Sequence, residues 1–273
     1  MNRRISFKIF SRQCILAVNF IFLFFSVNAT AGIMHDFDIR VSFDGALTDS
    51  QKGVFTDAEN FWENLIIGYR NEFDGPGLDI AASSIYKDGK GGILGSASYT
   101  STQSAGTQDT DDYYRYASQG VMSFDSADMD NMNSGRLLNL ILHEMAHVMG
   151  FGTLWVSNDL LNDNKDYIGE FGLAGHRIDI ADANAAFVPV EKGGGSSTAL
   201  YHWDETDFGG SPELMTGWLD NDITVSRATI NSFADLGYVI NPEFSVEHVP
   251  EPSTLAIFAL ALLGLRARKT NKA

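Results

Sequence analysis

The sequence contains a single cysteine, Cys14. It lies in an apolar run, residues 14–27, which follows four basic residues and precedes the small residues 29–31. This order is typical of a secretory signal, so we expect residues 1–31 to be removed. An uncleaved membrane anchor is the alternative. The mature protein would then have no disulfide and no thiol ligand, and a packed core must hold its fold.

Basic residues are also scarce. The chain has 19 Lys and Arg against 35 Asp and Glu, which gives a net charge of −16. Both ends are basic, so the central part is more acidic than the whole. A body of this charge is not expected to bind nucleic acid or anionic lipid surfaces. Some of its aspartates are candidates for binding calcium.

The C-terminal end has three consecutive parts. Pro250-Glu251-Pro252 is followed by an apolar run, residues 255–265, and then by the basic segment 266–269. Together they resemble the PEP-CTERM sorting signal of Gram-negative bacteria. The resemblance implies an envelope or surface protein that is held briefly in the inner membrane and cut near Pro-Glu-Pro by an exosortase-type enzyme. Without it, the same residues are read as a short membrane anchor with a positive inside flank.

Between these ends the pattern of apolar residues predicts an α+β fold. Alternation predicts a strand at 37–43, and short β-like segments predict further strands at 78–84, 93–99 and 120–124. Helices are expected at 48–69, from apolar spacing of three and four residues, and at 134–149. A last helix is expected from Ser226 to Gly237. We therefore predict a catalytic subdomain at 32–152, an irregular subdomain with one helix at 153–241, and a linker with the sorting tail at 242–273.

The helix expected at 134–149 contains two histidines four residues apart. His143 and His147 would share one face of the helix and could reach one metal ion, with Glu144 beside the water to be activated. Gly150 can take positive φ and end the helix. The alternative for Glu144 is a solvated glutamate on the helix surface.

This His-Glu-x-x-His-x-x-Gly pattern resembles the metzincin zinc endopeptidases. In the common pattern a third histidine follows three residues after the glycine, where this chain has Thr153. Leishmanolysin-like metzincins insert a long segment there. The chain resembles them in its delayed His202-Trp203 and in a later turn with Met215. The resemblance implies that His202 is the third ligand and that Met215 forms an apolar floor beneath the metal. His176 and a carboxylate remain alternatives.

The resemblance implies a metzincin-like fold, with a twisted mixed sheet, a backing helix and an active-site helix. It also implies Zn²⁺ as the cofactor and a protein or peptide substrate, with Glu144 as the general base of a secreted endopeptidase. Two other functions remain open. One is a catalytically silent zinc-binding matrix or adhesion protein, and the other is a zinc hydrolase of a non-peptide amide. The intact Glu144 favours an enzyme.

Overall fold

The structure is a computed structural model that describes residues 37–244 except 46, 72, 74, 109, 111, 207–211 and 220–222. Its strands are β1 (Ile39–Asp44), β2 (Ile66–Tyr69), β3 (Leu78–Ile85), β4 (Gly95–Ala105), β5 (Tyr114–Asp125) and β6 (Tyr238–Ile240). Its helices are α1 (Asp49–Leu65), α2 (Ser126–Met129), α3 (Ser134–Met149), α4 (Glu170–Asp179) and α5 (Arg227–Asp235), with a 3₁₀ turn η1 at Val156–Asn158. The predicted signal peptide and nearly all of the predicted sorting tail lie outside the described residues.

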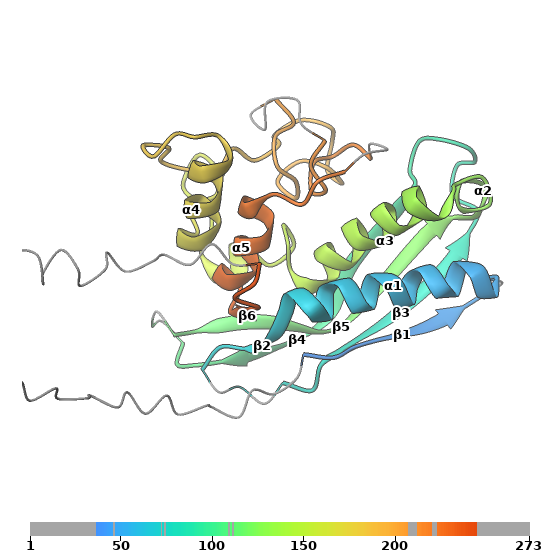
Figure 1. The fold of residues 1–273 in the computed structure, drawn as a ribbon, viewed down its shortest axis with the longest axis horizontal. Helices are drawn as coiled ribbons and strands as arrows, with labels where there is room; N and C mark the ends of the chain where they lie inside the picture. The colour runs from blue at the N-terminus through green and yellow to red at the C-terminus, as the bar shows by residue number, and fades with distance from the viewer. Residues whose placement is uncertain are drawn as a thin grey trace, which may run out of the picture. The chain divides into compact units, whose positions relative to one another are not determined.

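Four strands form a mixed sheet in the order β1-β3-β5-β4. The first three are parallel, and β4 runs antiparallel to β5. Figure 1 shows α1 and α3 lying along the sheet. In β3 the residues Leu78, Ile80 and Ala82 are buried and their neighbours are more exposed, as expected for a sheet with one covered face. The prediction of an α+β fold with a mixed sheet is confirmed.

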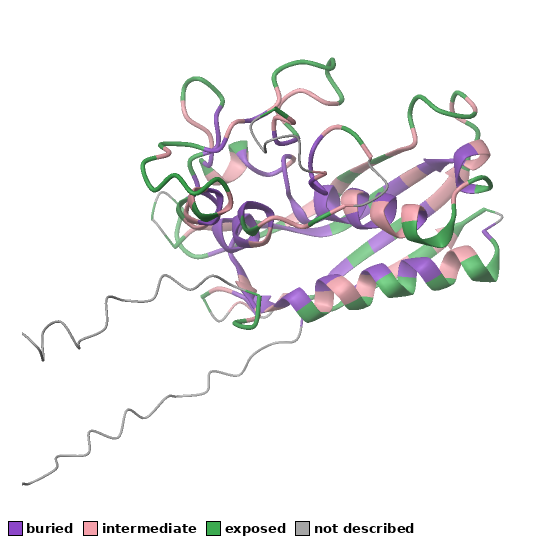
Figure 2. Cartoon of the chain, turned by 45° about the horizontal axis from the view of Figure 1, so that its top comes forward, coloured by how far each residue is buried: buried purple, intermediate pink, exposed green. Residues whose placement is uncertain are grey.

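Helix α1 begins with a capping box, in which the Thr48 side chain accepts from the Gln51 N–H and Gln51 reaches back to the Thr48 N–H. Its buried face includes Phe55, Ala58 and Trp62, and Figure 2 shows buried and exposed residues alternating along it. The predicted end at residue 69 is wrong. The chain leaves the helix after Leu65 and forms β2, which pairs antiparallel with β6 from the far end of the described chain.

Strands β4 and β5 are both longer than the predicted segments 93–99 and 120–124. They form an antiparallel pair along their whole length, from Gly95 opposite Phe124 to Ala105 opposite Tyr114. Strand β4 is rich in serine and threonine, and as the last strand of the sheet it leaves many of these side chains at the surface. Such a polar edge strand gives little hydrophobic signal, so the sequence pattern underestimates its length.

The prediction of one helix in the C-terminal part is also wrong, because α4 precedes α5. The two helices cap each other. The Asp179 carboxylate at the end of α4 accepts from the Ala228 N–H at the start of α5, at 3.0 Å. The Asp235 carboxylate at the end of α5 accepts from the Phe171 and Gly172 N–H groups at the start of α4, at 3.0 and 2.7 Å. Each helix therefore satisfies free N–H groups of the other.

A carboxylate anchors the loop between β3 and β4. Oδ2 of Asp125 accepts from the N–H groups of Lys87, Asp88 and Gly89 at 2.8, 2.8 and 3.0 Å, and Oδ1 accepts from Ala127 N–H at 2.7 Å. Burial alone would raise the pKa of Asp125, but these four donors favour the charged form and lower its pKa from 3.8 to about 2.

Because of this carboxylate, we expect the stability of the fold to depend on pH. The folded pKa of Asp125 lies below its unfolded value, so its contribution is complete above about pH 4 and is lost as the pH falls toward 2. We expect Asp125→Asn to lower the urea midpoint at pH 7, because an amide offers one acceptor oxygen in place of two. The difference from wild type should narrow between pH 4 and pH 2. A difference that does not change with pH would contradict the assignment.

Candidate metal centre

Helix α3 carries two of the predicted ligands. It begins at Ser134, where the Asn133 side chain accepts from the Arg136 N–H, and it ends at Gly150 with φ of 118°. The Gly150 N–H returns to the carbonyls of Ala146 and His147. These bounds agree with the predicted helix, and Gly150 ends it as expected. His143 and His147 therefore lie one turn apart on the same helix.

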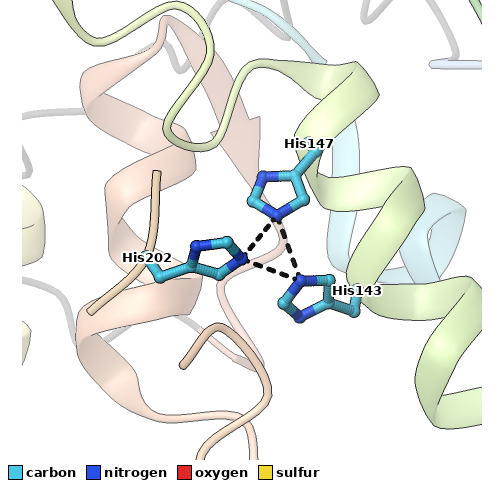
Figure 3. Close-up of side chains that lie close together, drawn as sticks. All are labelled: His143, His147 and His202. Carbon is cyan, nitrogen blue, oxygen red and sulfur yellow. Dashed lines mark hydrogen bonds between the residues drawn. The ribbon is translucent and has the colours of Figure 1, made fainter. Parts of the chain in front are cut away.

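His202 completes a cluster of three imidazoles. Its Nε2 lies 3.1 Å from the Nε2 of His143 and 3.1 Å from that of His147, and the two helix histidines are also 3.1 Å apart. Figure 3 shows the rings of His143 and His147 projecting from α3, with His202 facing them from a separate segment. In the described part of the chain, these three residues are the one group with metal-ligand geometry.

Each ring is held by its other nitrogen. Nδ1 of His143 lies 2.7 Å from the carbonyl of Leu214, Nδ1 of His147 lies 3.0 Å from that of Phe151, and Nδ1 of His202 lies 2.9 Å from that of Thr198. A carbonyl can only accept, so each Nδ1 carries the proton in the neutral ring. The three Nε2 atoms are then unprotonated and direct their lone pairs toward one another. None of them can donate a hydrogen bond to the others. A shared cation would remove this repulsion.

The imidazoles are neutral at physiological pH. Burial, followed by the charge of His202, lowers the pKa of His143 to about 3. Burial and the two neighbouring histidines lower the pKa of His147 well below its usual value, and burial lowers that of His202. Neutral imidazole is the form that binds a metal ion. The cluster is therefore ready to coordinate without first losing protons.

Glu144 lies next to the cluster on α3 and is almost fully buried. A Cβ at Gly95, the first residue of β4, would lie 2.5 Å from its Oε1, so the carboxylate packs closely against the edge strand. Burial raises its pKa to about 8, against the opposing charge of Lys87. A buried carboxyl of raised pKa beside a metal-ligand set is typical of a functional site.

Met215 lies in the turn that supports His143. It is fully buried, and it directly follows Leu214, whose carbonyl accepts from His143. The Met215 carbonyl accepts from the Trp203 N–H at 3.0 Å, which joins the turn to the residue after His202. The structure thus brings the predicted turn and the predicted third ligand together. The role of Met215 as a floor for the metal remains a prediction.

Two other sequence positions have different roles. Thr153 stands where common metzincins have their third histidine, and its hydroxyl donates to the His147 carbonyl at 2.7 Å, near the end of α3. His176, the alternative third ligand, lies on α4 and lines a separate cavity of about 250 Å³. It is not part of the histidine cluster.

The comparisons with known proteins concern the end of the chain. Residues 248–269 match the PEP-CTERM protein-sorting motif. This match confirms the predicted sorting signal. The chain is thereby marked for export, for processing by an exosortase at its C-terminus, and for the cell envelope or surface of a Gram-negative bacterium. No curated protein matches the chain. Among the described residues, no helix is long and apolar enough to cross a membrane.

Several residues that shape the site were not predicted. The three carbonyls that hold the imidazoles carry no sequence signal, because every residue has a carbonyl. Gly152 has φ of +72°, and a Cβ there would lie 2.7 Å from the Cα of Tyr201, immediately before His202. The chain after α3 can therefore approach the third ligand only because residue 152 has no side chain. In the sequence, the only sign of this close approach is that residue 152 is a glycine.

Gly152 yields a direct test of the cluster. We expect Gly152→Ala to push the Tyr201-His202 backbone away from α3, destabilising the fold by about 1–3 kcal/mol as overpacking does and weakening the binding of added zinc to the histidine cluster. Gly53→Ala is the matched control, because Gly53 lies in α1 with no atom within 4 Å of the added carbon. It should stabilise by about 0.5–1 kcal/mol. Wild-type zinc binding by Gly152→Ala would argue against this packing role.

Proposed function

We propose that this chain is a secreted zinc-dependent endopeptidase related to the leishmanolysin-like metzincins. The observation that carries the proposal is the convergence of three neutral imidazoles beside a buried glutamate, which lies on the helix that carries two of them. Three ligands and one open position are typical of catalytic zinc, whereas structural zinc is enclosed by four protein ligands. The confirmed sorting motif supports a site of action outside the inner membrane.

The donor set fits zinc. Three nitrogens at the corners of a triangle with 3.1 Å sides leave room for one ion at the usual Zn–N distance of about 2.0–2.1 Å. Imidazole also binds copper, iron and nickel, so the ligands alone do not exclude those metals. Zinc is favoured because the neighbouring Glu144 supplies the proton acceptor that a hydrolytic zinc site requires.

Bound zinc would lower the pKa of a water molecule toward about 7 and polarise the scissile carbonyl. The Glu144 carboxylate would accept a proton from the attacking water and later donate it to the leaving amine. In the metal-free protein, burial keeps this carboxyl largely protonated at neutral pH. A divalent cation close by would favour its charged form, so metal binding would also prepare the base.

The edge strand supports a peptide as the substrate. Within the described sheet, β4 pairs with β5 alone, and its first residue packs against Glu144. Its outer edge therefore presents backbone donors and acceptors beside the proposed base. An extended peptide can add to such an edge as one more strand. This arrangement would lay a peptide bond along the strand that borders the metal site.

Three variants test the proposal, with casein as the substrate. Glu144→Gln should keep one zinc per chain and lose cleavage by about 10²–10⁴-fold, the usual contribution of a general base. His202→Ala should lose both zinc and cleavage. His176→Ala removes the alternative ligand and should keep the zinc.

A chelator should abolish wild-type cleavage, and zinc should restore it. Wild-type cleavage by Glu144→Gln would refute the peptidase mechanism. Stoichiometric zinc in His202→Ala would refute the ligand assignment. Zinc binding with no cleavage of any protein substrate would instead favour a silent binding protein.

A further inference from the structure

A second glutamate, Glu213, lies at the start of the turn with Met215 and is only 2% exposed. Its Oε2 accepts from the Met215 N–H at 2.5 Å. Its Oε1 accepts from the Ser226 N–H at 3.1 Å, from the Ser226 hydroxyl at 2.9 Å and from the Thr229 hydroxyl at 2.7 Å. Four donors thus surround one buried carboxylate, which joins the turn to the start of α5.

These contacts lead to two of the three imidazoles. Leu214, between Glu213 and Met215, provides the carbonyl that holds His143. On the other side, Thr229 Oγ1 accepts from Trp203 Nε1 at 2.8 Å, and Trp203 directly follows His202. The Glu213 carboxylate and the Thr229 hydroxyl therefore link the turn that holds His143 to the residue that follows His202.

We propose that Glu213, acting with Thr229, is a positioning residue that sets the orientation of His143 and His202 in the metal centre. The proposal rests on the proposed metal site. It assigns a role to a residue outside the zinc motif. Partners of metal ligands fix the direction of each ring, and their loss commonly weakens metal binding about 10–100-fold.

The role requires a carboxylate. A glutamine at this position would keep one acceptor oxygen and turn the other into an NH₂ donor. Whichever way the amide faces, its NH₂ donor would then meet either the Met215 N–H or the Ser226 N–H, two backbone donors that cannot become acceptors. The turn that carries Leu214 or the contact that holds Trp203 would have to shift. Glu213→Gln therefore keeps the size of the side chain and replaces one of its two acceptors by a donor.

The experiment compares zinc affinity, measured by competition with a chromogenic chelator, with the unfolding midpoint of the zinc-free protein. The visible spectrum of bound Co²⁺ reports ligand geometry. We expect Glu213→Gln to weaken zinc binding by about 10–100-fold and to change the Co²⁺ spectrum. Thr229→Val should act in the same direction, and Thr229→Ser, which keeps the hydroxyl, should restore wild-type affinity.

Asp125→Asn is the matched control. Asp125 is also buried and also accepts four hydrogen bonds, but its partners are Lys87, Asp88, Gly89 and Ala127. This variant should lower the unfolding midpoint and leave zinc affinity and the Co²⁺ spectrum unchanged. A purely structural role for Glu213 would give the same result, so such a result for Glu213→Gln overturns the proposal.

The remaining outcomes are also decisive. If Glu213→Gln does not fold, the comparison of Thr229→Val with Thr229→Ser decides, and equal zinc affinity in both would reject the role. If the wild-type protein binds no zinc, the metal centre itself fails, and the positioning role fails with it. If wild type binds zinc without cleaving casein, the peptidase proposal fails while the positioning role can still be confirmed by affinity and spectrum.

Discussion

Three neutral imidazoles direct their lone pairs toward one point, and the hydrogen bonds from their Nδ1 atoms to main-chain carbonyls hold them there. Without those bonds the rings would turn away from one another, because the lone pairs of Nε2 atoms 3.1 Å apart repel. The three carbonyls come from the turn after α3, from the segment before His202 and from the turn at Leu214. The fold has to bring these separate segments together, and the glycines that end and follow α3 make the close approach possible.

The local part of the site could be predicted from the sequence. His143, Glu144 and His147 follow from helical spacing, and Gly150 follows from the requirement for positive φ at the end of a helix. The bounds of α3 were close to those expected. His202 and Met215 required a resemblance to known peptidases, because no periodicity connects residues so far apart in the chain. In the structure His202 lies against His143, and Met215 follows Leu214, whose carbonyl holds His143.

What could not be predicted depends on long-range pairing and burial. Strand β2 looked like the last turn of a helix because its partner β6 lies at the other end of the described chain. Helix α4 was missed because Gly172 and Gly175 weaken its helical signal; a Cβ at Gly175 would meet the backbone at the start of α5. The roles of Glu213 and Thr229 could not be predicted, since an acidic or hydroxyl side chain gives no sign of burial until its hydrogen-bond partners are known.

The distance along the chain between His147 and His202 has a consequence for a protein with no disulfide. An ion held by both would close a loop of 55 residues. In a chain-entropy treatment, a cross-link of that span restricts the unfolded chain by about 4 kcal/mol. The ion would then act as the staple that cysteines provide in other exported proteins. The supply of that ion would then govern how long the folded chain survives.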